Sequence, residues 1–85
     1  IQKAAEHGFS TAQYNLALKY YHGRGVEKNL SLGYMWYILA AANGDEAARI
    51  AVQKIEQEIT PLSVEFGHKL ADRCARQNYM NCNKL

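Results

Sequence analysis

The sequence predicts an all-α fold: an α-α superhelix, or solenoid, of antiparallel helix pairs with about four helices plus the tail of a preceding one. The first observation is an internal repeat, since an alanine pair, a glycine and a further alanine recur 36 positions later: Ala4, Ala5, Gly8 and Ala12 return as Ala40, Ala41, Gly44 and Ala48. The second is helical spacing of the apolar residues between them. The third is that Gly, Asn and Thr-Pro, which are typical helix start and stop signals, separate the apolar runs. A repeat of this length is typical of stacked helical hairpins.

The bulk composition narrows the class of protein. The chain has 85 residues, so we expect one domain or part of one. With 48% hydrophobic and 21% charged residues, it is not a disordered sequence. A net charge of +2 is too small to predict a nucleic-acid partner. The longest apolar run, residues 34–42, is too short to cross a membrane, so we expect no membrane insertion.

The first predicted helix covers residues 10–22. Ser10 or Thr11 is expected to cap its free backbone N–H groups. The glycines of Gly23-Arg24-Gly25 end it, because glycine tolerates the left-handed backbone of a helix terminus. Its buried face is predicted to consist of Ala12, Leu16, Ala17 and Tyr20.

The second predicted helix covers residues 30–43. Asn29 or Ser31 is expected to cap it, and Gly44 ends it. Small and large residues alternate on its apolar face, which allows neighbouring helices to interdigitate. That face is predicted to consist of Gly33, Trp36, Tyr37, Ala40 and Ala41.

Two further helices complete the prediction. The third begins near Asp45, whose charge suits a helix N-terminus, and buries a stripe of Ala48, Ala51, Val52, Ile55 and Ile59. The fourth covers residues 61–77, because Thr60-Pro61 is a strong start signal. Its buried face is predicted to consist of Val64, Gly67, Leu70, Ala71 and Cys74. The tail, residues 78–85, has no period, and we expect it to be loose.

The chain contains two cysteines, too few for a disulfide framework. We expect Cys74 and Cys82 to be free thiols, with Cys74 packed as a small hydrophobe. A bridge that fastens the tail to the last helix is the alternative, which geometry decides.

Several of these residues resemble the Sel-1-like repeat, a relative of the tetratricopeptide repeat. The resemblance lies in Ala12-Gln13-Tyr14-Asn15-Leu16-Ala17, Tyr20, Gly23-x-Gly25-Val26, Trp36-Tyr37 and Ala40-Ala41-x-x-Gly44. Two departures from the family stand out. At Ala17 and Gly33 the two small residues that the family usually has are interchanged, and residues 45–77 lack the Gly-x-Gly-Val turn. The resemblance implies the C-terminal repeats of a bacterial-type member. It divides the chain into the end of a preceding repeat (1–7), one full repeat (8–44), a degenerate terminal repeat or cap (45–77) and the tail (78–85).

What the resemblance implies for function is a scaffold without shared catalytic residues, which binds another protein or peptide on its concave face. The first helix of each pair is expected to line that face. We define the tyrosine strip as the i, i+3, i+4 series beside the buried face of the first helix: Thr11, Tyr14, Leu18, Tyr21 and His22. The positions 36 residues later, the second strip, are Ala47, Ile50, Lys54, Gln57 and Glu58. Alternatively, Tyr14, Leu18 and Tyr21 pack against a preceding unit or fill space between units.

The sequence predicts neither catalysis nor a cofactor. The three histidines and two cysteines have no zinc-ligand spacing, so we expect no metal site. The carboxylates of Asp45, Glu46, Glu56 and Glu58 are interpreted as solvated helix surface. Two alternative functions stay open: a β-lactam-binding, enzyme-like member of the family, and a purely structural solenoid cap. Because each repeat needs neighbours to bury its faces, we also expect weak self-association through exposed repeat ends.

Overall fold

The structure is a computed structural model that describes residues 2–85, so the part of the predicted preceding repeat at residue 1 lies outside it. The helices are α1 (Gln2–Glu6), α2 (Ser10–His22), α3 (Leu30–Ala42), α4 (Glu46–Glu56), α5 (Pro61–Arg76) and the short 3-10 helix η1 (Cys82–Lys84). Between residues 2 and 85 there is no β-strand. The predicted all-α fold class is confirmed, and the predicted bounds of α2, α3 and α5 and the start of α4 lie within one residue of the observed ones, but α4 ends at Glu56, before the predicted stripe residue Ile59.

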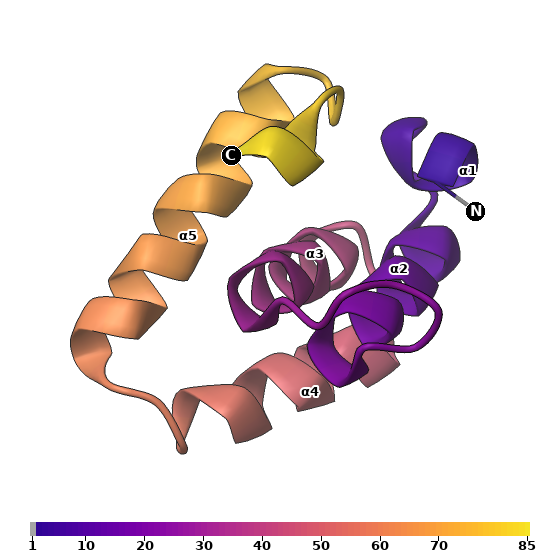
Figure 1. Cartoon of the computed structure of the whole chain (residues 1–85). Coiled ribbons are helices and arrows are strands. Elements are labelled where there is room, and N and C mark those ends of the chain that lie inside the picture. The colour runs from indigo at the N-terminus through magenta and orange to yellow at the C-terminus, as the bar shows by residue number, and fades with distance from the viewer. Residues whose placement is uncertain (1) are drawn as a thin grey trace.

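Helix α3 lies at the centre of the molecule (Figure 1). It forms a tight antiparallel hairpin with α2, and α4 and α5 both pack on it. Its sequence is apolar on all sides, which is the pattern of a buried helix. The predicted buried face was therefore too narrow, because Leu32, Tyr34, Met35 and Leu39 are buried as well. Helices α4 and α5 have few contacts with each other, so the two diverge from their connecting loop and are joined through α3.

Local signals explain where the helices begin. The side chains of Asn29, Asp45 and Thr60 accept hydrogen bonds from the backbone N–H groups of Leu32, Ala48 and Ser63, at 3.0, 2.8 and 3.1 Å. These are N-caps of the standard kind. The prediction for α2 was wrong, because its N-cap residue is Phe9, and no side chain caps it. Ser10 and Thr11 already lie inside the helix.

Helices α2 and α3 approach very closely at Gly33. A Cβ atom at this position would lie 2.7 Å from the backbone nitrogen of Tyr21, so only glycine fits. Further along the hairpin, the side chain of Gln13 is fully buried. It donates to the carbonyl of Ala5 at 3.1 Å and accepts from Asn43 at 2.9 Å, which joins α1 and the end of α3 to α2.

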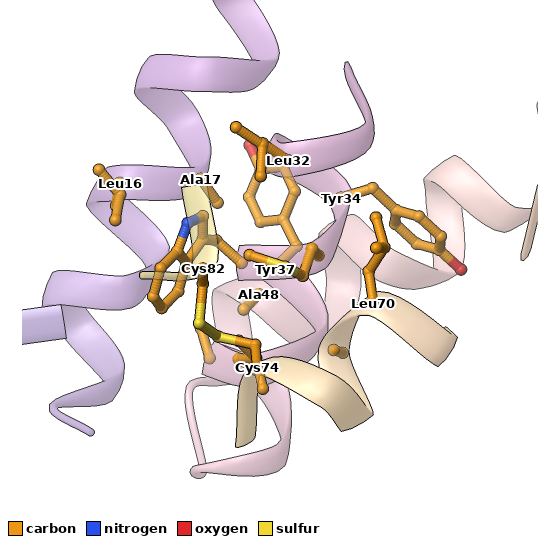
Figure 2. Packing of buried hydrophobic residues seen from close by; sticks show 14 of the residues in the cluster. Leu16, Ala17, Leu32, Tyr34, Tyr37, Ala48, Leu70, Cys74 and Cys82 are labelled. Carbon is orange, nitrogen blue, oxygen red and sulfur yellow. A yellow bond between two sulfur atoms is a disulfide. The ribbon is translucent and has the colours of Figure 1, made fainter. Parts of the chain in front are cut away.

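The C-terminal tail is folded, so the prediction of a loose tail was wrong. Cys74 on α5 and Cys82 in η1 form a disulfide (Figure 2), and the expectation of free thiols was wrong too. Both residues are buried, and their Cα atoms are 5.2 Å apart. The tail had no periodicity because it is a compact reversal: Asn78, Tyr79 and Asn81 have left-handed backbone angles, which asparagine adopts more readily than most residues and a bulky residue such as tyrosine rarely does.

The tail also contacts α3 and α1. Trp36 on α3 is fully buried, and its ring nitrogen donates to Asn83 Oδ1 at 3.2 Å. The amide nitrogen of Asn83 then donates to Gln2 Oε1 on α1 at 3.1 Å. Beside it, the ring of Tyr79 lies against Gly8. Residues from the two ends of the chain therefore meet over one face of α3.

Candidate functional site

A groove of about 500 Å3 lies where the start of α3, the end of α4 and the start of α5 meet. It exists because α4 and α5 diverge while both rest on α3 (Figure 1). Tyr21 of α2 completes one wall. We call this the α3–α4–α5 groove. It is lined by Tyr21, Leu30, Ser31, Tyr34, Ile55, Ile59, Thr60, Leu62, Ser63, Phe66 and Gly67.

Three large apolar side chains of the groove are exposed. Leu30 is 51%, Phe66 53% and Leu62 77% exposed. Leu62 and Phe66 are four residues apart on α5, so they form one ridge along the helix. Scattered exposed apolar residues are ordinary on a protein surface, but three that line the same concavity are typical of a binding surface.

Tyr34 in the wall of the groove is held by a carboxylate. Its hydroxyl donates to Glu56 Oε2 at 2.6 Å, and His68 Nε2 lies 2.9 Å from the same oxygen. The hydrogen bonds from Tyr34 and His68 hold the pKa of Glu56 below its ordinary value of 4.5. Burial, and then the bond to Glu56, raises the pKa of Tyr34 well above its ordinary value. The interpretation of Glu56 as solvated surface was therefore wrong, since it links α3, α4 and α5.

The floor of the groove depends on a glycine. Gly67 lies directly against the ring of Tyr34, and a Cβ atom at this position would collide with the ring. The absence of a side chain lets α5 approach α3 closely and leaves the ring edge of Tyr34 open to the groove.

Comparison with known proteins finds a family match for part of the sequence. The sequence pattern of the Sel1 repeat matches residues 10–45, which cover α2, α3 and the N-cap of α4. Residues 10–45 of the chain therefore form a Sel1 repeat. This family consists generally of protein–protein interaction modules.

One relative is the chitin synthase regulator SKT5 of Saccharomyces cerevisiae, which is 39% identical to this chain over 46 residues. The match covers 54% of this chain and 7% of SKT5, so it compares the Sel1 repeat region and not two whole proteins. Because this relative is from yeast, the expected bacterial type stays a prediction. No solved structure matches the chain.

The tyrosine strip of the Sel1 repeat is partly buried. Tyr14 and Tyr21 both pack on the ring of Tyr37 from α3, with ring centroids 5.7 and 5.8 Å apart. Burial, and then the neighbouring Tyr14 and Tyr21, raises the pKa of Tyr37 to about 12. Leu18 is half-buried, whereas Thr11 and His22 are exposed. Of the five, Tyr21 also lines the α3–α4–α5 groove.

The second strip is outside the groove. Ile50, Lys54 and Gln57 are all exposed, with Ile50 54% exposed, and none of them lines the groove wall. The two strips therefore remain a predicted surface, which meets the groove at Tyr21 and borders it at Glu58, next to the lining residues Ile59 and Thr60.

Sequence reasoning missed the apolar groove residues Leu30, Leu62 and Phe66. A signal for two of them was present: Leu62 and Phe66 stand one turn apart directly after the Thr60-Pro61 start. Neither falls on the predicted buried face of α5, which indicates an apolar side chain without an internal partner. Their meeting with Leu30 could not be predicted, because it depends on how α5 crosses α3.

Within residues 2–85, no three His, Cys, Asp or Glu side chains gather as a metal-binding group. In the same part of the chain, no helix has the length and apolar character needed to span a bilayer.

Proposed function

We propose that this protein, which contains a Sel1 repeat, is a non-catalytic protein–protein interaction scaffold that holds its partner in the α3–α4–α5 groove. The observation that carries the proposal is the exposure of Leu30, Leu62 and Phe66 around one concavity. Burial of such side chains by a partner removes apolar surface from water, which is the main favourable term in protein association. Within the proposal, residues 8–44 are one full repeat and residues 45–77 a degenerate terminal repeat.

Two further points support a binding role. The groove is formed by three helices whose arrangement is fixed by Glu56, so it is largely pre-formed, as binding sites usually are. The yeast relative is described as the regulator of an enzyme, and regulation through another protein agrees with a scaffold. The tyrosine strip and the second strip are a second candidate surface for the same function.

The test is affinity purification from the source cell with three versions of the chain as bait. They are the native chain, a groove variant with Leu62→Gln and Phe66→Gln, and a strip control, Ile50→Gln. The control is matched, because Ile50 is as exposed as Phe66 but lies outside the groove. Circular dichroism checks that all three keep their helices.

We expect a specific partner that is retained by the native chain and the Ile50→Gln control and lost with the groove variant. Loss with Ile50→Gln alone would move the binding site to the strips. If no partner distinguishes the three baits, the chain is a structural cap. Turnover of a β-lactam by the native chain would contradict a non-catalytic role.

A further inference from the structure

We propose that the occupant of the α3–α4–α5 groove is a basic amphipathic helix of a partner protein, with apolar side chains one turn apart and Lys or Arg residues beside them. This inference rests on the proposed function and specifies the chemistry of the partner. It follows from the apolar lining of the groove and from the sign of the charges along its rim.

Three of the five hydroxyl side chains that line the groove are engaged within the chain: Tyr34, Thr60 and Ser63. The hydroxyl of Tyr34 is bonded to Glu56. The hydroxyl of Thr60 lies 3.1 Å from that of Ser63 and also accepts the Ser63 backbone N–H. Among the described residues, the hydroxyls of Tyr21 and Ser31 have no such bond, so a partner finds two hydroxyls for polar contacts in the groove, and its main anchor must be apolar. The ridge of Leu62 and Phe66 has the i, i+4 spacing that packs between the corresponding ridges of a second helix.

The segment that forms two walls of the groove is acidic, with Lys54 and Lys69 directly outside its two ends. From Ile55 to His68, this segment carries Glu56, Glu58 and Glu65 and no Lys or Arg. This contrasts with a net charge of +2 for the whole chain. The acidic character is therefore local to the segment that forms the groove.

The three carboxylates differ in how much charge they present to a partner. Glu65 is paired with Lys69 at 3.0 Å. Glu56 is shared by Tyr34 and His68 and, since its pKa is lowered, stays ionised at neutral pH. Glu58 is exposed and lies close enough to the groove to act on Tyr21, whose pKa is raised by burial and then by the Glu58 charge. Glu58 is thus the group most open to a cation of the partner.

An acidic partner is disfavoured by the same arrangement, because its carboxylates would face Glu56 and Glu58 across apolar walls. A second copy of this chain is the other occupant to consider. The distal half of α5 carries Lys69, Arg73 and Arg76, but Lys69 and Arg76 are paired with Glu65 and Asp72 on their own helix. A helix with unpaired basic residues therefore fits the groove better.

The experiment is selection from a random peptide library displayed on phage, with the native chain as target. Peptides are kept when the groove variant, Leu62→Gln with Phe66→Gln, no longer binds them. Their sequences are then compared with the unselected library, and the affinities of the best binders are measured by fluorescence anisotropy at low and high salt. Further targets are Glu58→Lys and two matched neutral variants, Glu58→Gln at the groove and Glu46→Gln at the far end of α4.

We expect the groove-dependent peptides to be enriched in apolar residues three or four positions apart and in Lys and Arg. Their affinity should fall roughly two- to threefold with Glu58→Gln and up to about tenfold with Glu58→Lys, and it should fall with salt. Glu46→Gln should leave it unchanged.

Three results would overturn the inference. Groove-dependent peptides without a basic excess, or with an acidic one, would refute the charge argument and leave the proposed function standing. A concentration-dependent dimer that the groove variant abolishes would make a second copy the occupant. If no selected peptide depends on Leu62 and Phe66, the groove is not a peptide site, and the proposed use of the groove fails with the inference.

Discussion

The hydroxyl of Tyr34 and the carboxylate of Glu56 form a 2.6 Å hydrogen bond between α3 and α4. The same carboxylate oxygen lies 2.9 Å from the ring nitrogen of His68, so the contact reaches α5 as well. Because α4 and α5 have few direct contacts, this carboxylate helps to set the opening between them. The width of the groove is thus tied to the ionisation of one residue.

Acid should weaken this link. The folded-state pKa of Glu56 is lowered, so its contribution to stability is present above the unfolded value near 4.5 and is lost as pH falls through the lower folded value. We expect Tyr34→Phe to reduce the free energy of unfolding by roughly 1 kcal/mol at neutral pH, because it removes a hydrogen bond to a partly exposed charge. The reduction should shrink as the carboxylate is protonated. Urea denaturation at several pH values measures it, with Tyr14→Phe as the control for loss of a hydroxyl. A reduction that does not change with pH would contradict the role of Glu56.

The helix caps can be tested against one another. We expect Asn29→Ala, Asp45→Ala and Thr60→Ala each to lower the free energy of unfolding by about 1 kcal/mol, since each side chain satisfies a backbone N–H group. Ser10→Ala should change it by less than about 0.5 kcal/mol, because Ser10 is inside α2 and caps nothing. Urea unfolding curves give all four values. An equal loss for Ser10→Ala would show that Ser10 is the cap after all.

Two glycines should differ in what an added methyl group does. At Gly67 the obstacle is the ring of Tyr34, a side chain that must shift although Glu56 holds its hydroxyl, and we expect Gly67→Ala to destabilise by about 2 kcal/mol. At Gly33 the obstacle is the backbone of Tyr21, so Gly33→Ala should cost about 3 kcal/mol or more. Thermal and urea unfolding measure both. If alanine's better helix propensity prevailed and both variants were more stable, the close approaches described here would be wrong.

The disulfide should hold the tail on α3. It spans eight residues, and its loss should lower the free energy of unfolding by about 2.5 kcal/mol through the entropy of the unfolded chain. Trp36 is the sole tryptophan and is bonded to the tail, so its fluorescence should shift to the red when a reductant frees the tail. A variant with Cys74→Ala and Cys82→Ala is the control, since its fluorescence should not respond to the reductant. An unchanged emission of the native chain on reduction would show that other contacts hold the tail.

Local chemistry explains what could be predicted from the sequence. The end of α2 follows from Gly23, and the starts of α3, α4 and α5 follow from Asn29, Asp45 and Thr60-Pro61, each of which acts on its own neighbours in the chain. The buried Leu16 and Ala17 follow from helical spacing.

What could not be predicted depends on distant contacts. The order of the tail requires Cys74, Cys82 and Asn83 to meet partners on other elements. The groove requires α5 to pack on α3 instead of α4, which no periodicity encodes. The role of Glu56 could not be predicted for the same reason. A carboxylate on a helix is expected to face solvent unless its partners from other elements, here α3 and α5, are known.

The bond from Asn83 to Gln2 joins residues 81 positions apart, whereas most helix contacts join neighbours along the chain. Such a contact has a large loop-closure entropy and a high contact order, so we expect it to form after the hairpin of α2 and α3. The docking of α1 against the tail should then be among the last contacts to form and the first to open, whereas the disulfide keeps the tail beside α5. Amide hydrogen exchange would show this as weak protection in α1 beside strong protection in α3.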